Sequence, residues 1–159
     1  MSTKKMRRAL QKGNRYERAE AAIELGRLSD KESAPELKRQ LDDPDDLIAI
    51  SSMYGCWLLG DESVTTERAV SALASQDEET VQAAVQALCE MGEAIVPDLV
   101  GQLEAGSPHA AEIVRLLGDI GGDEGLEAVK KVARTAARKL AETARSVLDD
   151  WDEEDEDLD

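Results

Sequence analysis

A block of about 31 residues recurs along this chain, and this repeat limits the possible folds more than any other feature. When the chain is aligned on the apolar residue near the end of "AAIELGRLSD" (residues 21–30), five copies appear at separations of 31, 32, 29 and 31 residues. The aligned residues are Leu25, Cys56, Leu88, Leu117 and Leu148. The residues three positions later are also apolar: Leu28, Leu59, Met91, Ile120 and Trp151. Two columns that shift together over the same spacing indicate a true repeat.

Each copy predicts a pair of helices. A second series of segments lies between the aligned ones, with apolar residues at the i, i+3 or i+4 spacing of one helix face. These segments are "SAPELKRQL" (33–41), "TTERAVSAL" (65–73), "AIVPDLVGQL" (94–103) and "EGLEAVKKV" (124–132). Joints such as "DDPDD" (42–46) and "AGSP" (105–108) supply Asp or Ser that can cap the next helix.

A helix pair of this size cannot bury its own apolar face, and stacking on a neighbouring pair completes the core. No segment carries a strand signal. We therefore predict an all-α chain that forms a right-handed alpha-alpha superhelix of about five helix pairs. The predicted repeat domain covers residues 1–151, and residues 152–159 are predicted to be an acidic disordered tail.

These segments resemble HEAT repeats, which form solenoids of the HEAT/armadillo-like class. The resemblance is to the short version of the repeat found in phycobilisome-lyase-type proteins. The family unit reads approximately "VRxxAAxALGxIGD" followed by a helix of the "AVPxLIxLL" kind. The matching segments are "ERAEAAIELGRLSD" (17–30), "VQAAVQALCEMGE" (81–93), "EIVRLLGDIGGD" (112–123), "SAPELKRQL" and "AIVPDLVGQL". The resemblance implies the fold, and it implies little about function because these repeats serve many unrelated tasks.

The chain departs from the family pattern in two columns. The family's arginine is present only at Arg18, so this column does not predict a ladder of Arg-to-acid contacts between repeats. The family's glycine is kept at Gly26 and Gly118, and it is replaced in the other copies by Trp57, Cys89 and Asp149. The second repeat is therefore the irregular one.

The formal charge of -16 is unevenly distributed. Residues 1–18 hold seven of the 19 Lys and Arg, whereas residues 149–159 hold nine acids and no base. Such a negative charge repels nucleic acids and anionic membranes and favours a soluble monomer that binds a basic partner. The N-terminal bases are predicted to offset the acidic body, and the alternative is that they contact phosphates.

The sequence carries no pattern typical of catalysis. His109 is the only histidine and is expected at a helix start, and Cys56 and Cys89 are expected to be small buried apolar residues. No zinc-ligand spacing, nucleophile motif or phosphate loop occurs. We therefore expect a protein that is not an enzyme and needs no metal or cofactor.

One apolar stripe suggests a binding site. Leu47, Ile50, Tyr54 and Trp57 are spaced by 3, 4 and 3 residues, so they share one face of the predicted helix 46–59. Tyr16 and Ile23 of the preceding repeat extend the stripe sideways. An exposed Tyr and Trp beside aliphatic residues would anchor a protein partner. In the alternative interpretation, Met6, Leu10 and the rest of the N-terminal segment cover this helix, so that it is apolar on two faces.

Together these patterns predict a non-enzymatic protein-protein interaction module, a scaffold or adaptor that binds its partner on the concave helical face. Two alternatives stay open. The resemblance to bilin lyases implies an accessory subunit or chaperone-like partner of a modification enzyme, and the basic N-terminus would suit a nucleic-acid-binding protein. The chain lacks both an apolar run of about 20 residues and the apolar stretch of a signal peptide, so we expect it in the cytoplasm.

Overall fold

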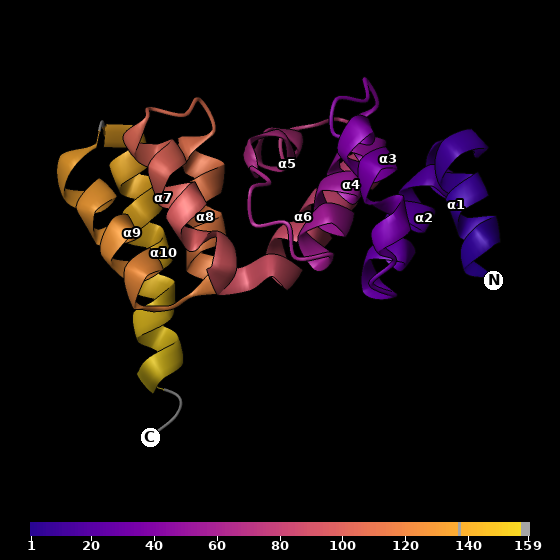
Figure 1. The fold of residues 1–159 in the computed structure, drawn as a ribbon. Coiled ribbons are helices and arrows are strands. Elements are labelled where there is room, and N and C mark those ends of the chain that lie inside the picture. Colours follow the sequence, from indigo (N-terminus) through magenta and orange to yellow (C-terminus); the bar gives the residue numbers. More distant parts are fainter. Residues whose placement is uncertain (137, 157–159) are drawn as a thin grey trace. The chain divides into compact units, whose positions relative to one another are not determined.

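The computed structural model describes residues 1–136 and 138–156, and over these residues the chain is helical with no strand (Figure 1). The predicted all-α class is therefore confirmed. Within the same described residues, no helix combines the length and the apolar character needed to cross a membrane.

The chain divides into two compact units, residues 1–87 and 88–159, and the division falls inside one helix. Unit 1 contains α1 (Thr3–Lys12), α2 (Arg15–Arg27), the 3-10 helix η1 (Lys31–Ser33), α3 (Ala34–Gln40), α4 (Asp46–Leu58), α5 (Glu67–Ala72) and the first part of α6 (Glu78–Met91). Unit 2 contains the end of α6, the 3-10 helix η2 (Gly92–Ile95), α7 (Val96–Glu104), α8 (Ala110–Ile120), α9 (Asp123–Thr135) and α10 (Arg138–Glu156). Each unit is described separately below.

The predicted helix pairs are present. The first helices of the repeats are α2, α4, α6, α8 and α10, and the four predicted second helices correspond to α3, α5, α7 and α9. The predicted start signals also act locally. The Asn14 side chain accepts hydrogen bonds from the Tyr16 and Glu17 amides, and the Asp45 carboxylate accepts one from the Leu47 amide at 3.0 Å. His109 is the N-cap residue of α8, at the expected helix start.

Glycines bring the first helices of neighbouring repeats together within each unit. In unit 1, α2 packs against α4, and a Cβ atom added to Gly26 would lie 2.8 Å from the Gly55 carbonyl oxygen. In unit 2, α8 packs against α10, and a Cβ atom on Gly118 would lie 2.4 Å from a methyl carbon of Val147. Both pairs are 29 residues apart, so the two units use the same repeat register at this crossing.

The core of unit 1 joins α1 to the first two repeats. Leu10 of α1 is buried against α2, α3 and α4 in a cluster that comprises Leu10, Ala21, Ala22, Leu25, Leu37 and Cys56, with Met6 packed at its edge. A buried polar residue links the same helices, because Gln40 donates hydrogen bonds to the Leu10 carbonyl oxygen at 2.7 Å and to the Glu36 carboxylate at 2.8 Å. Its amide oxygen accepts a hydrogen bond from the Ser52 hydroxyl.

The two cysteines lie in different environments. Cys56 is buried in the unit 1 core as expected, and burial raises the pKa of its thiol to about 11. Cys89 is exposed, so the prediction of two buried cysteines is wrong for this residue. The reason is its position on α6, where Leu88 and Met91 take the buried face and Cys89 lies on the other side.

The predicted acidic tail overlaps the last helix. Trp151 lies within α10, and its indole nitrogen donates a hydrogen bond to the Gly118 carbonyl oxygen at 2.9 Å. The helix continues to Glu156, so part of the segment 152–159 is helical, and residues 157–159 lie outside the described residues.

The glycine crossing of unit 1 can be tested by adding a single methyl group. We expect Gly26→Ala to lower the free energy of unfolding by about 1–3 kcal/mol, because the new Cβ atom meets the backbone of α4, which cannot turn aside. Gly101→Ala in α7 is the matched control, since a Cβ atom there has no neighbour within 4 Å. The control should gain up to about 1 kcal/mol from helix propensity. Urea unfolding of both variants checks this, and equal effects would contradict the close approach.

Candidate interaction surface

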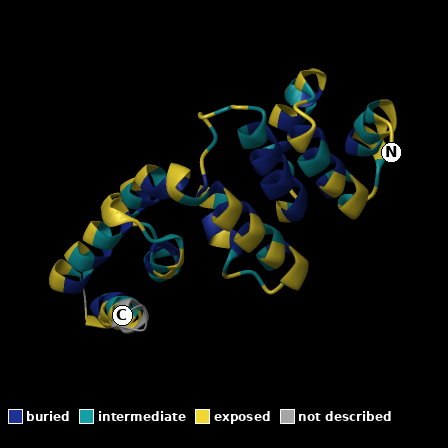
Figure 2. Ribbon diagram, turned by 90° about the horizontal axis from the view of Figure 1, so that it is seen from below, coloured by how far each residue is buried: buried dark blue, intermediate teal, exposed yellow. Residues whose placement is uncertain are grey.

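The apolar stripe on α4 is buried. Leu47, Ile50 and Tyr54 are only 6%, 1% and 3% exposed, and Trp57 is half-buried. The structure therefore contradicts their predicted role as an exposed protein-binding anchor. The physical reason is that α4 packs against α2, α3 and α5, and every residue from 47 to 56 is buried (Figure 2). A helix that is apolar on all sides belongs in a core.

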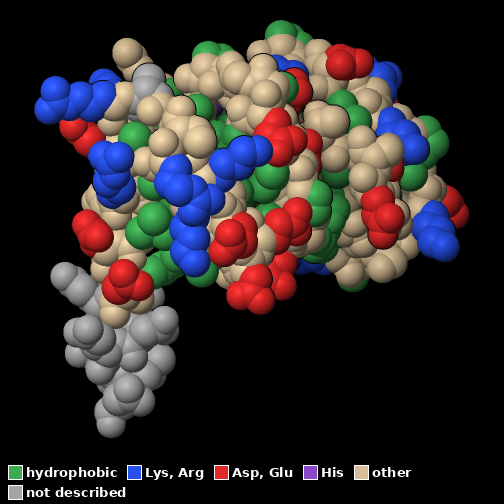
Figure 3. Space-filling model, turned by 90° about the vertical axis from the view of Figure 1, so that its left-hand side faces the viewer, with side chains coloured by type: hydrophobic (Ala, Val, Ile, Leu, Met, Phe, Trp, Pro, Cys, Tyr) green, Lys and Arg blue, Asp and Glu red, His purple; other side chains and the backbone are tan. Residues whose placement is uncertain are grey.

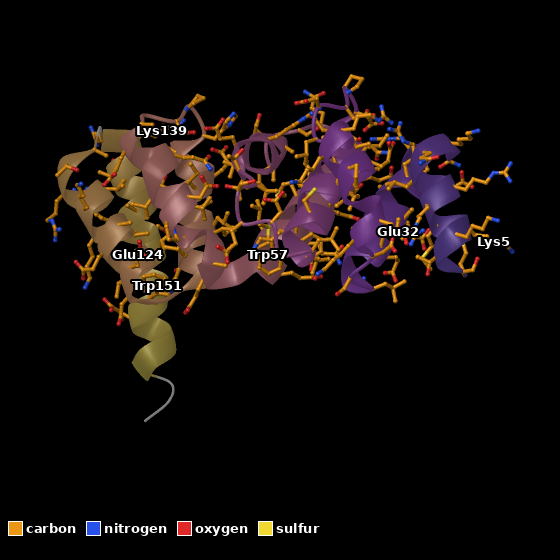
Figure 4. The ribbon with its side chains drawn as sticks, in the orientation of Figure 1. Lys5, Glu32, Trp57, Glu124, Lys139 and Trp151 are labelled. Carbon is orange, nitrogen blue, oxygen red and sulfur yellow. The ribbon has the colours of Figure 1, made fainter. Side chains whose placement is uncertain are left out.

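The segment predicted to cover this stripe covers another surface. Met6 and Leu10 pack in the cluster that contains Cys56, on a different face of α4 from Tyr54. Ile50 instead lines a pocket of about 380 Å³ together with Val64 and Arg68 from the α4–α5 connection and α5. Tyr54 and Trp57 stack on each other, with ring centroids 6.0 Å apart and planes inclined by 17°. Figure 4 shows Trp57 near the end of α4.

Two predicted residues remain on the surface. Tyr16 is 51% exposed and Ile23 is half-buried. They are seven residues apart, which places both on the same face of α2 two turns from each other. Of the six predicted site residues, Tyr16 is thus the large side chain that the structure leaves available to a partner.

Charged side chains hold Tyr16 in place. The Arg15 guanidinium carbon lies 5.4 Å from the centre of the Tyr16 ring, within the range of a cation-π contact. The neighbouring Glu79 carboxylate raises the pKa of Tyr16, through hydrogen bonding first and through its negative charge second. The aromatic ring is therefore fixed at its face by α2 and at its hydroxyl by α6.

Arg15 connects the starts of three first helices. Its guanidinium donates to the Asp45 carboxylate at 2.9 Å and to the Asp77 carboxylate at 2.7 Å, and it lies 3.7 Å from the Glu79 carboxylate. Asp45 caps α4, whereas Asp77 and Glu79 stand at the start of α6. We call Tyr16, Arg15, Asp45, Asp77 and Glu79 the Tyr16 patch. It contains three carboxylates and one guanidinium, so its net charge is negative.

The pKa shifts in the Tyr16 patch follow from these contacts. Hydrogen bonding to Arg15, followed by hydrogen bonding to Thr80, lowers the pKa of Asp77. The hydrogen bonds that Arg15 donates to Asp77 and Asp45 in turn raise the pKa of Arg15. Folding therefore stabilises the charged forms of Asp77 and Arg15.

The arginine network of Arg15 lies outside the Arg18 column of the repeat, so the family pattern did not predict it. Arg18 does reach the next repeat and donates to Asp43 at 2.7 Å, and Arg68 of α5 pairs with Asp46 at 2.7 Å. The available signal was the helix-capping column, in which Asn14, Asp45 and Asp77 recur at spacings of 31 and 32 residues. A base placed one residue after the first cap can reach the carboxylates at the next two.

The N-terminal bases fall into two groups. Arg7, Arg15 and Arg18 pair with carboxylates of the helical body, as the prediction of charge compensation requires; Arg7 donates to Asp30 at 2.8 Å and also pairs with Glu32. Lys4, Lys5, Arg8 and Lys12 pair with no carboxylate of the described residues, and Figure 4 shows Lys5 pointing away from α1. Over the part of the chain that the structure describes, no cluster of His, Cys, Asp and Glu side chains is arranged to hold a metal ion.

Comparison with known proteins adds little to these findings. No model of a protein family matches the chain, and no curated protein matches it. One solved structure that it is similar to is the crystal structure of an engineered protein from the Northeast Structural Genomics Consortium. The match has 20% sequence identity and a TM-score of 0.45, and it covers 93% of this chain and 78% of the other.

The burial of α4 predicts a loss of stability when the stripe is truncated. We expect Tyr54→Ala to lower the free energy of unfolding by about 3 kcal/mol, because it removes a buried ring that stacks on Trp57. Tyr16→Ala, which truncates the half-exposed tyrosine, should cost less than about 1 kcal/mol. Thermal and urea unfolding of the two variants check this. A Tyr54→Ala protein as stable as the parent would show that the stripe is not core.

The arginine network predicts a specific pH dependence. The pKa of Asp77 is lowered on folding, so its contribution to stability is complete above the unfolded value of about 3.9 and is lost as pH falls through the lower folded value. We expect Arg15→Met to lose less unfolding free energy than the parent between neutral pH and about pH 3, because the favourable partner is already absent. Arg8→Met removes the same charge from an exposed residue without a carboxylate partner and should keep the parent's pH profile.

Proposed function

We propose that this chain is a non-enzymatic protein-interaction module, a scaffold or adaptor built from stacked helix pairs. The shared 29-residue register at the crossings of α2 with α4 and of α8 with α10 supports an alpha-solenoid arrangement, because α2 and α8 each receive the next first helix in the same way. Such a frame provides a preformed surface, and a preformed surface binds without a large ordering cost.

One observation carries this proposal, namely the geometry of Tyr16. A half-exposed tyrosine is fixed by Arg15 and Glu79 in the unbound protein, so little side-chain freedom is lost when a partner covers it. Tyrosines in such positions are frequent anchors of protein interfaces. Because α2, α4 and α6 all contribute to the Tyr16 patch, the surface belongs to the stacked helices and not to a loop.

The charge of the surface selects the kind of partner. Three carboxylates surround one guanidinium in the Tyr16 patch, and the exposed acids Asp46 and Glu78 lie next to these carboxylates in the sequence. Such a surface favours a segment that contains Lys or Arg and raises its rate of encounter. The proposed occupant is therefore a basic segment of another protein, with an apolar or aromatic residue against Tyr16.

This function predicts a residue-specific loss of binding. The chain is used as bait in an extract of its native source, and the captured proteins are identified by mass spectrometry at low and at high salt. We expect Tyr16→Ala to weaken capture of the true partner by about tenfold or more, the size expected for an interface anchor. Capture should also decrease at high salt.

The matched control is Leu28→Ala, because Leu28 is an exposed apolar residue at the C-terminal end of the same helix, whereas the Tyr16 patch lies at its N-terminal end. It should capture the partner as the parent does. Any protein that both variants capture equally well is not the proposed ligand, and the absence of a protein that distinguishes them would contradict the proposal.

A further inference from the structure

Unit 2 contains an open groove between two second helices. It has a volume of about 630 Å³ and is larger than the hollows of about 380, 450 and 460 Å³ found elsewhere on the described chain. Val100 and Leu103 of α7 and Ala128 and Val132 of α9 form its apolar walls, and Leu140 of α10 closes one end. A hollow of this size accommodates a few large side chains of a ligand.

The chain next to this groove is basic. Residues 130–145 contain six Lys and Arg and one acid, in a protein with 35 acids and 19 bases. Lys131 itself lines the groove. Figure 3 shows a side of the molecule on which Lys and Arg side chains lie among hydrophobic ones. Figure 4 places Lys139 at the end of unit 2 that also holds the α7–α8 connection.

The positive charge beside the groove is only partly neutralised by carboxylates. Lys131 pairs with Glu104 at 3.6 Å across two exposed side chains, which is a weak contact. Arg134 and Lys139 are exposed and pair with no carboxylate of the described residues. Lys130 and Arg138 in the same segment pair with Glu127 and Glu142 of their own helices, through exposed side chains.

We propose that the groove between α7 and α9 binds an acidic amphipathic segment of a partner protein, with apolar side chains on Val100, Leu103 and Val132 and carboxylates on Lys131, Arg134 and Lys139. An amphipathic helix places apolar residues at i, i+3, i+4 and i+7 on one face and fits an apolar groove in this way. Carboxylates beside that face complete the charge complementarity.

The lining residues favour this occupant over nucleic acid. Apart from the Lys131–Glu104 pair, the walls are mainly aliphatic, and the lining of the groove contains no aromatic side chain for a base to stack on. Residues 149–156 of the same molecule are acidic but cannot fill the groove, because the helix α10 leads away from Leu140 for sixteen residues to Glu156, about 24 Å.

The inference goes beyond the proposed function, because it concerns a second surface and a partner of opposite charge. Two labelled synthetic peptides of about four helical turns serve as probes. Both carry leucine at the i, i+3, i+4 and i+7 positions, and the remaining positions are glutamate in one peptide and lysine in the other. Fluorescence anisotropy measures their binding to the full chain, and amide chemical shifts locate the bound peptide.

The glutamate peptide should bind at least about tenfold more tightly than the lysine peptide to the parent, with shifts in α7 and α9. The variant Lys131→Glu/Arg134→Glu/Lys139→Glu should lose at least about tenfold in affinity for it. The matched control is Lys4→Glu/Lys5→Glu/Arg8→Glu, which changes the net charge equally at exposed bases of α1 and should bind as the parent does. Ala128→Leu, which fills the groove without altering charge, should also weaken binding.

Three results would overturn the inference: equal binding of the two peptides, equal losses in the two triple variants, or shifts confined to residues outside α7 and α9. A free chain that sediments as a dimer, and becomes monomeric in the Lys131/Arg134/Lys139 variant, would also overturn it by showing that a second copy occupies the groove. The proposed function is tested separately, by the effect of Tyr16→Ala on capture of the partner. The same variant should leave binding of the glutamate peptide unchanged.

Discussion

The close approach of neighbouring first helices is the constraint on which this structure depends. At Gly26 and Gly118 the next first helix lies so near that even a methyl group would overlap with it. Packing at this distance maximises contact between helices whose apolar residues are mostly Ala, Val, Leu and Ile. Trp57 of α4 occupies the repeat position that Gly26 and Gly118 occupy in α2 and α8. The helices α4 and α6 approach each other less closely than α2 and α4 do.

Electrostatics has a different role in each unit. In unit 1 a few arginines each pair with one or more carboxylates. Arg15 binds both Asp45 and Asp77, which stand at the starts of α4 and α6. In unit 2 the bases at the end of α9 and the start of α10 have fewer partners. An acidic protein can therefore present surfaces of both signs, because the net charge of -16 says nothing about how the ionic groups are distributed.

Periodicity predicted the helices well and the surface poorly. Repeat spacing, prolines and capping residues located every helix pair, because these signals act over a few neighbouring residues. Periodicity did not predict the burial of Tyr54, because a helix that is packed on several sides has no polar face to mark the solvent side. A second apolar stripe on such a helix can then be mistaken for an exposed site. The Arg15 contacts join residues 30 and 62 positions apart, and the groove of unit 2 depends on how α7 and α9 pack, which no local pattern specifies.

The helix α6 has a consequence for how the molecule can be dissected. Ala87 and Leu88 belong to different compact units, yet both are buried residues of one uninterrupted helix. Cleavage at this point would interrupt the helix and leave each fragment with a frayed end. A fragment that contains only one unit should therefore begin or end in a connection outside α6. The fragment that includes α6 is the one that keeps a complete terminal repeat.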